Sequence, residues 1–151
     1  MISFTKVSLP YGWLGNMSAF PIQYDGKVWR TSEALFQSLR FDDDEIKEII
    51  RNERSPMGAK MKSKKYASQM SVKPMSDIDV ENMKLCLRLK LEYHPQLKDE
   101  LYKTGTQIIV EDIGGRNGER HLFWGAKIIN DEIVGKNIVG NIWMELRKEL
   151  I

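Results

Sequence analysis

The chain has 151 residues, of which 42% are hydrophobic and 29% are charged. These values predict one globular domain over residues 1–151, long enough to build a core. The net charge of +2 is too small to indicate nucleic-acid binding by itself. Cys86 is the one cysteine, which excludes an intrachain disulfide, and with two histidines it makes a zinc site unexpected. The sequence shows neither a signal peptide nor an apolar run of about 18 residues, so we expect a cytoplasmic protein that does not span a membrane.

Alternation of polar and apolar residues predicts short strands near the N-terminus. Residues 2–7 alternate weakly and are expected to form an edge strand. A stronger signal lies in residues 20–29, where Asp25-Gly26 separates two alternating segments. Because Asp-Gly favours the positive φ angles of a type I′ turn, residues 20–29 are predicted to form a β-hairpin.

Residues 31–41 are predicted to form a short helix directly after the hairpin. The hydroxyl of Thr31 or Ser32 can cap its first turn. Glu33 has two interpretations, since a first-turn carboxylate either complements the helix dipole or begins an active site. A polar stripe and an apolar stripe run side by side along this helix. Their members are Glu33, Gln37 and Arg40, and Leu35, Phe36 and Leu39.

Two further helices are predicted to follow. Residues 42–45 are four acids, which favour the start of a helix. Ser55-Pro56 pairs a capping hydroxyl with a proline suited to the first helical position. This third helix carries a basic cluster, which is either a solvated face or a contact for phosphate. The cluster consists of Lys60, Lys62, Lys64 and Lys65.

The longest helix is predicted over residues 76–93, with Ser76 as its cap. Its apolar residues fall on two faces, which is typical of a central helix packed against several neighbours. These faces are Val80, Met83, Leu87 and Leu91, and Ile78, Leu85 and Leu89. Lys90 lies on the apolar side. Either its stem snorkels to water, or its amine is partly buried with a lowered pKa and can act as a nucleophile.

The C-terminal part combines a buried strand with loops and a final helix. Residues 107–111 are predicted to form the strand, and Glu111 at its end is well placed for a cleft. Residues 112–120 form a glycine-rich loop without the spacing of a phosphate-binding loop. Asn137 is expected to cap the final helix, whose exposed backbone amides would suit a phosphate.

Several separated motifs occur in a fixed order along the chain. They are Gly15-Asn16 with Ala19-Phe20-Pro21, Asp25-Gly26, Thr31-Ser32-Glu33 with Phe36-Gln37, Ser55-Pro56, residues 83–90, Val110-Glu111, Trp124-Gly125 and Gly135-Lys136-Asn137. Together they resemble the YbiA-like, or NADAR, family from residue 14 to the end of the chain. The resemblance implies an α+β fold, a helix-rich single domain with a small β-sheet.

The resemblance also implies an enzyme that cleaves an N-glycosidic bond without a metal or a cofactor. Family substrates are phosphorylated ribosylamines such as early riboflavin intermediates, or ADP-ribose attached to guanine in nucleic acid. The family carries a glutamate, a lysine and a glutamate where Glu33, Lys90 and Glu111 stand, and a tryptophan-glycine pair where Trp124-Gly125 stands. The chain departs from the family pattern near the expected pocket, which bears on substrate choice. The departures include Ala34, His121 and Ala126.

Cleavage of such a bond requires protonation of the leaving base and stabilisation of a cationic sugar carbon. We expect Glu33 and Glu111 to divide this work, while Lys90 offers a second route through ring opening and an imine with C1. Binding contacts are expected from aromatic walls and from amides that hold hydroxyls or phosphate. These residues are Phe36 and Trp124 beside Gly125, and Asn16, Gln37 and Asn137.

Two alternatives of another class remain. The chain could be a non-catalytic module that binds ADP-ribose or another nucleotide, a reading supported by the departures at Ala34 and Ala126. It could also be a nucleic-acid-binding module that uses its basic residues. As partners we expect a small nucleotide-like molecule or ADP-ribosylated nucleic acid, and a monomer or weak homodimer.

Overall fold

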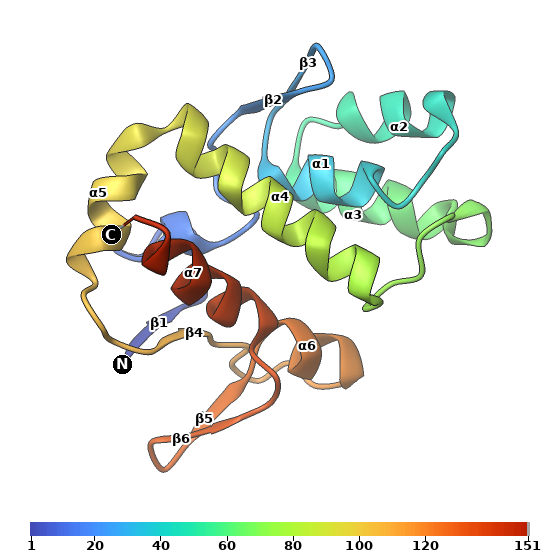
Figure 1. Ribbon diagram of the computed structural model, residues 1–151. Helices are drawn as coiled ribbons and strands as arrows, with labels where there is room; N and C mark the ends of the chain where they lie inside the picture. The colour runs from blue at the N-terminus through green and yellow to red at the C-terminus, as the bar shows by residue number, and fades with distance from the viewer. Residues whose placement is uncertain (151) are drawn as a thin grey trace. The chain divides into compact units, whose positions relative to one another are not determined.

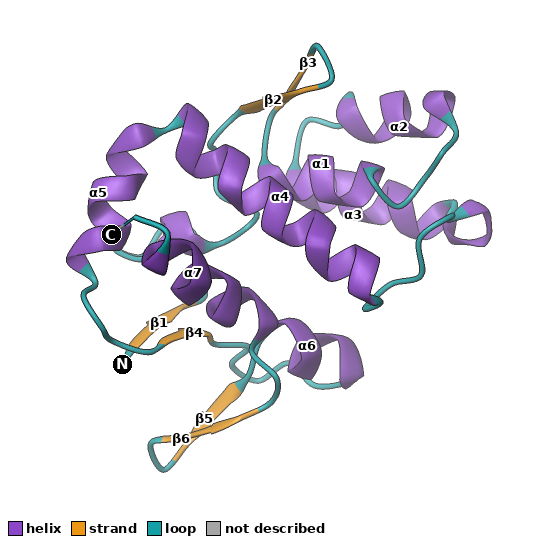
Figure 2. Cartoon of the chain, viewed as in Figure 1, coloured by secondary structure: helices purple, strands orange, loops and turns teal. Residues whose placement is uncertain are grey.

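The computed structural model describes residues 1–150, which form two compact units. One unit consists of residues 16–94, and the other combines residues 1–15 with residues 95–150. Both contain helices and short strands, which Figure 2 colours purple and orange. The predicted α+β, helix-rich class is therefore confirmed, and the strands form small two-stranded pieces. None of the helices within residues 1–150 is long and apolar enough to cross a membrane.

The unit of residues 16–94 begins with the predicted hairpin, in which β2 (Ile22–Tyr24) runs antiparallel to β3 (Lys27–Trp29). Asp25 and Gly26 form the turn with φ angles of 51° and 73°. Both lie in the left-handed region that a type I′ turn requires, so the Asp-Gly prediction is confirmed.

Three short helices follow, and each is capped by the residue type expected for it. Thr31 accepts a hydrogen bond from Ala34 N at 3.1 Å, so it caps the first helix ahead of Ser32. The second and third helices are capped by Asp43 and Ser55. The helices are α1 (Ser32–Ser38), α2 (Asp44–Arg51) and α3 (Pro56–Lys65), and a 3₁₀ turn, η2 (Ala67–Gln69), follows them.

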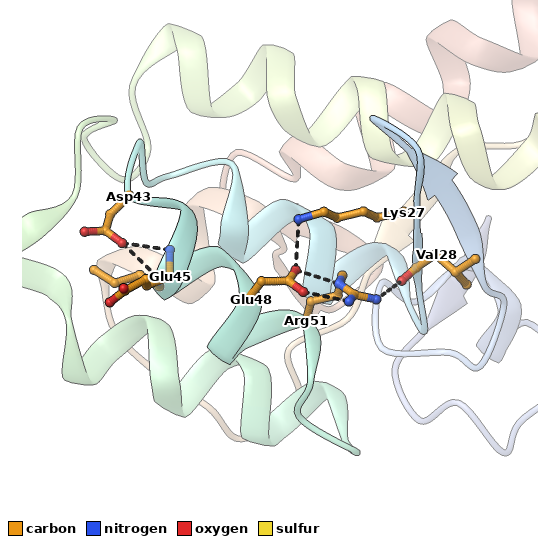
Figure 3. Close-up of polar contacts among 7 residues, drawn as sticks. Lys27, Val28, Asp43, Glu45, Glu48 and Arg51 are labelled. Atoms are coloured by element: carbon orange, nitrogen blue, oxygen red, sulfur yellow. Dashed lines mark hydrogen bonds and ion pairs between the residues drawn. The ribbon is translucent and has the colours of Figure 1, made fainter.

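Polar contacts join α2 to the hairpin (Figure 3). The Glu48 carboxylate receives both a bidentate contact from Arg51 at 2.7 Å and an ion pair from Lys27 at 3.2 Å. Arg51 also donates to the carbonyl oxygen of Val28 at 3.3 Å. The group fixes the hairpin against α2 at the surface of this unit.

The longest helix, α4 (Asp77–Tyr93), begins at the predicted cap Ser76. Met83, Leu87 and Leu91 are buried, as the first apolar face requires. The second face was predicted wrongly at its N-terminal end, because Ile78 is 62% exposed. Ile78 lies in the first turn of α4, where no other part of the unit covers its side chain.

In the other unit, β1 (Ile2–Phe4) pairs in parallel with β4 (Ile109–Glu111), and α7 (Ile138–Lys148) packs on β4 (Figure 1). The N-terminal strand is therefore shorter than residues 2–7. The indole of Trp143 on α7 is fully buried and donates to Leu14 O at 2.9 Å. The remaining elements are η1 (Gly12–Leu14), α5 (Pro95–Lys103), α6 (Glu119–Trp124), β5 (Lys127–Ile129) and β6 (Glu132–Val134).

The short helix α6 was not predicted, because residues 112–120 were interpreted as a loop throughout. Gly118 precedes it with a φ of 106° and has no side chain to cap it. Neither a capping residue nor a long apolar period marks its start, so local pattern gives no signal for this helix.

Candidate functional site

Glu33 holds a buried carboxylate on the first turn of α1, with 7% of the residue exposed. Gln37 lies one turn further along the helix, so its Nε2 reaches Glu33 Oε1 at 2.8 Å. Asn16 Nδ2 donates to the other oxygen, Oε2, at 2.7 Å. The loop at Asn16 is fixed there because Glu33 N donates to its carbonyl oxygen at 3.1 Å. Both carboxylate oxygens therefore accept N–H groups, the pattern suited to an ionised carboxylate.

Ser32 supports this arrangement from the preceding position of the helix. Its Oγ donates to the carbonyl oxygen of Asn16 at 3.0 Å and lies in a short contact with Asn16 Oδ1. A hydroxyl that faces Oδ1 leaves the Asn16 amide nitrogen to face Glu33. Asn16 and Gln37 were expected to hold substrate hydroxyls or phosphate, but the structure engages both amides with Glu33.

Lys90 lies on α4 and is fully buried, with 0% of the residue exposed. Its Nζ donates to Ser18 Oγ at 2.6 Å and lies 5.2 Å from the centre of the Phe20 ring. Burial disfavours the charged form and lowers the pKa of the amine from 10.5 to about 7. The snorkelling interpretation is therefore wrong, and the buried amine is the observed one. The position of a lysine on the apolar side of the helix was the signal for it.

Phe36 on α1 and Arg40, two residues beyond the end of that helix, form a second layer. Phe36 is buried, and the Arg40 guanidinium lies 4.7 Å from the centre of its ring. Arg40 is buried as well and makes two hydrogen bonds to Asp79 of α4, at 2.9 Å and 2.8 Å. The sequence placed Arg40 on a polar stripe but gave no signal for Asp79, which is 39 residues away.

In the other unit, Asn137 lies against the end of β4 beside Glu111. Its Oδ1 accepts a hydrogen bond from Glu111 N at 2.9 Å, and its Nδ2 donates to Ile109 O at 2.8 Å. Asn137 precedes α7 in the left-handed conformation, with a φ of 51°, and its side chain makes no capping bond. Asn137 therefore stands at the predicted cap position of α7, but its side-chain amide binds the strand instead of the first turn of the helix.

Gly125 and Trp124 lie at the end of α6. A Cβ at position 125 would stand 2.6 Å from Glu111 O, so only glycine allows this approach. Gly125 O accepts a hydrogen bond from Asn137 N at 3.0 Å. The ring of Trp124 lies edge-on to Phe123 with centres 4.8 Å apart. Gly125 thus joins the group formed by Glu111 and Asn137, and Trp124 precedes it in the chain.

The structure thus gathers Asn16, Glu33 and Gln37 in one hydrogen-bonded group, in the unit that also contains Phe36 and Lys90. It gathers Glu111, Gly125 and Asn137 in a second group, with Trp124 beside it. Two of the departures from the family pattern, Ala34 and Ala126, are buried. Among residues 1–150, no group of three or more His, Cys, Asp or Glu side chains could hold a metal ion.

Comparison with known proteins agrees with the motifs. N-glycosidase YbiA of Escherichia coli strain K12 is 34% identical over 150 residues, which cover 99% of this chain and 88% of the relative. An N-glycosidase of Nostoc punctiforme is 26% identical over 99% of this chain and 92% of its own length. A riboflavin biosynthesis protein of Vibrio vulnificus is 29% identical over 99% of this chain, which covers 38% of that protein.

The solution structure of E. coli YbiA matches with a TM-score of 0.81 at 34% sequence identity, over 99% of this chain and 83% of that one. The model of the NADAR domain matches residues 3–151. The resemblance read from the ordered motifs is confirmed, and the chain belongs to the NADAR domain family.

Proposed function

We propose that the chain hydrolyses the N-glycosidic bond of a phosphorylated ribosylamine or nucleotide-type substrate. ADP-ribosylated guanine and an early riboflavin intermediate are the two forms to test first. The enzyme class is supported by relatives that are named N-glycosidases, and the riboflavin form by the name of the Vibrio vulnificus relative. The observation that carries the proposal is the buried Glu33 carboxylate, whose two oxygens accept amide N–H groups, in the unit that also buries Lys90.

The hydrogen bonds of Glu33 favour one of the two roles that cleavage requires. A carboxylate that accepts an N–H at both oxygens is suited to stabilise positive charge or to accept a proton. We therefore assign to Glu33 the stabilisation of the cationic sugar carbon. Glu111 is then the candidate that protonates the leaving base, as the family's second glutamate.

Lys90 supplies the second route. The C1–O4′ bond of the sugar opens, the base nitrogen gives up a proton that O4′ takes up, and this nitrogen remains bound to C1 as an imine. The neutral amine of Lys90 attacks C1 and displaces the base, which leaves with a proton, and water then hydrolyses the lysine imine and restores the amine. A pKa of about 7 supports this role, because a large fraction of the amine is uncharged at neutral pH.

The binding residues are assigned from what their side chains contact. Phe36 and Trp124 are proposed as aromatic walls for the base or the sugar. Asn16 and Gln37 act on Glu33, and Asn137 acts on the backbone of Glu111. Cytoplasmic location and a monomeric or weakly dimeric state remain predictions.

The test is release of the free base from ADP-ribosylated guanosine and from a ribosylaminopyrimidine phosphate. We expect Glu33→Gln and Lys90→Ala to lose activity, while Glu45→Gln, a control on the exposed start of α2, retains it. Full activity in both Glu33→Gln and Lys90→Ala contradicts the proposal. Borohydride distinguishes the two routes, because only the imine gives a covalent adduct with the substrate.

The non-catalytic alternative rests on the departures at Ala34 and Ala126, which place alanine where the family has polar residues. It is tested by calorimetry with ADP-ribose beside the hydrolysis assay. Tight binding without base release favours a binding module. A nucleic-acid-binding module is tested by the salt dependence of its affinity, which falls steeply when phosphates are neutralised.

A further inference from the structure

A line of buried side chains connects Glu33 on α1 to Asp79 on α4. Gln37 Nε2 donates to Glu33 Oε1 at 2.8 Å, and Gln37 Oε1 accepts from Arg40 Nη1 at 3.3 Å. Arg40 donates from Nε and Nη2 to the two carboxylate oxygens of Asp79, at 2.9 Å and 2.8 Å. All four residues are buried, and Asp79 has 0% of its surface exposed. The line continues the carboxylate group of the site into the interior of its unit.

The order of donors and acceptors along this line cannot be reversed at Arg40. A guanidinium has five N–H donors and no acceptor, so the Gln37 atom that faces it must be the oxygen. The amide nitrogen of Gln37 must then face Glu33. Glu33 and Arg40 therefore select the same orientation of the Gln37 amide, and without Arg40 the amide would lose the partner that holds its oxygen.

Contacts with Asp79, Phe36 and Ser71 hold Arg40 in place. Its planar fork matches the Asp79 carboxylate, and Asp79 Oδ2 also accepts a hydrogen bond from Met75 N at 2.9 Å. The ring of Phe36 lies against the guanidinium at 4.7 Å. The backbone oxygen of Arg40 accepts a hydrogen bond from Ser71 N at 2.8 Å. A side chain fixed in this way can determine the orientation of its neighbour.

We propose that Arg40 is a positioning residue, which acts through Gln37 to hold the Glu33 carboxylate in its working orientation. Asp79 in turn holds Arg40. The proposal rests on the proposed function of Glu33 and extends it to two residues that the resemblance did not single out. Arg40 contacts the site through Gln37 and Phe36, so its effect on catalysis is expected to pass through them.

The first test compares Arg40→Lys with Gln37→Met. Lysine retains the charge opposite Asp79 but cannot reach Asp79 and Gln37 at once, because it lacks the planar fork. We expect each variant to lower kcat by about 10- to 100-fold with little change in KM, as misplacement of a catalytic group does. The double variant is expected to fall no further than Gln37→Met alone, since Arg40 acts through Gln37.

A matched control separates this effect from the loss of a fork-like ion pair in general. Arg51 makes a bidentate contact with Glu48 in the same unit, within α2 (Figure 3). Arg51→Lys is expected to retain kcat and KM. Circular dichroism and thermal melting establish that each variant is folded at the assay temperature. If Arg40→Lys does not fold, Asp79→Asn weakens the same anchor and is expected to lower kcat in the same direction.

NMR spectroscopy can measure the environment of the Gln37 amide in the absence of substrate. The side-chain NH₂ signals of Gln37 are expected to shift in the ¹H–¹⁵N spectrum of Arg40→Lys and to remain in place in Arg51→Lys. Unchanged Gln37 signals in folded Arg40→Lys contradict the proposal. So does an undiminished effect of Arg40→Lys in the Gln37→Met background.

The activity of Glu33→Gln distinguishes failure of the catalytic role proposed for Glu33 from failure of the positioning role proposed for Arg40. If Glu33→Gln is inactive while Arg40→Lys is fully active, the positioning role fails and the proposed function stands. If Glu33→Gln is fully active, the role assigned to Glu33 fails. The Gln37 signals then still decide whether Arg40 sets the orientation of the amide.

Discussion

Replacement of Lys90 by methionine removes a buried amine and leaves a side chain of similar length. The amine costs free energy in the folded chain because burial lowers its pKa from 10.5 to about 7. Between these two values the unfolded chain binds more protons than the folded chain does. The free energy of unfolding of the wild type therefore rises with pH across this range, and Lys90→Met lacks this contribution.

The magnitude follows from the pKa. One pKa unit corresponds to about 1.4 kcal/mol, so the charged amine costs the fold about 4 kcal/mol at pH 7. Unfolding takes up a proton at Lys90 in this range and so becomes less favourable as pH rises, which lowers the cost by about 2 kcal/mol between pH 7 and pH 9. Lys90→Met is therefore expected to be more stable than the wild type at pH 7, and to lose about 2 kcal/mol of that advantage by pH 9.

Urea unfolding of both proteins at pH 7, 8 and 9 measures the two free energies. The difference between wild type and variant cancels the titration of all other groups. Lys64→Met on the exposed side of α3 provides the control, and its difference from wild type should be flat over this range. A flat difference for Lys90→Met as well would refute the claim that burial holds the amine near neutrality.

Three further outcomes are expected. If Lys90 attacks C1 as a neutral amine, kcat rises as pH increases through about 7, whereas a kcat independent of pH from 6 to 8 contradicts the imine route. Asn137→Ala leaves Glu111 N and Ile109 O without their buried partner, so unfolding in urea should show a loss of about 2–4 kcal/mol. A loss below about 0.5 kcal/mol would show that the hydrogen bonds of the Asn137 side chain contribute little. The pKa of Glu48 is lowered to about 2 by its hydrogen bond to the neighbouring arginine, so its stabilisation is present above 4.5 and is lost as pH falls through 2. Because Glu48 is partly exposed, we expect wild type to melt only about 1–3 °C above Glu48→Gln at pH 6, with no difference at pH 2.

Local chemistry explains the part of the fold that the sequence predicts. Thr31, Asp43 and Ser55 cap their helices with bonds to the next few residues, so the signal and the structure lie in the same short segment. The Asp25-Gly26 turn is local in the same way. Burial of Lys90 was one of the two predicted possibilities, because a charged residue on an apolar helical face must either reach water or be buried.

The features that were missed depend on partners far away in the chain. The side chain of Asn137 would cap α7 by local rules, but it binds β4 26 residues earlier. Arg40 and Asp79 each look like ordinary surface residues of a helix, and only the packing of α1 against α4 pairs them. A short helix such as α6 carries too few residues for a period to be recognised. Such long-range pairings set the geometry of the candidate site.

The buried charges of residues 16–94 differ in how the fold compensates them. Arg40 and Asp79 compensate each other through two hydrogen bonds, as a structural ion pair does. Glu33 is held by two neutral amides and has no ion-pair partner among these contacts, as the role proposed for it at the sugar carbon requires. Lys90 is buried at the cost of a lowered pKa, although a methionine would fill the same space without that cost. Because packing alone does not favour an amine there, the buried lysine supports the nucleophilic role proposed for it, and the pH dependence of stability in Lys90→Met measures what burial of the amine costs.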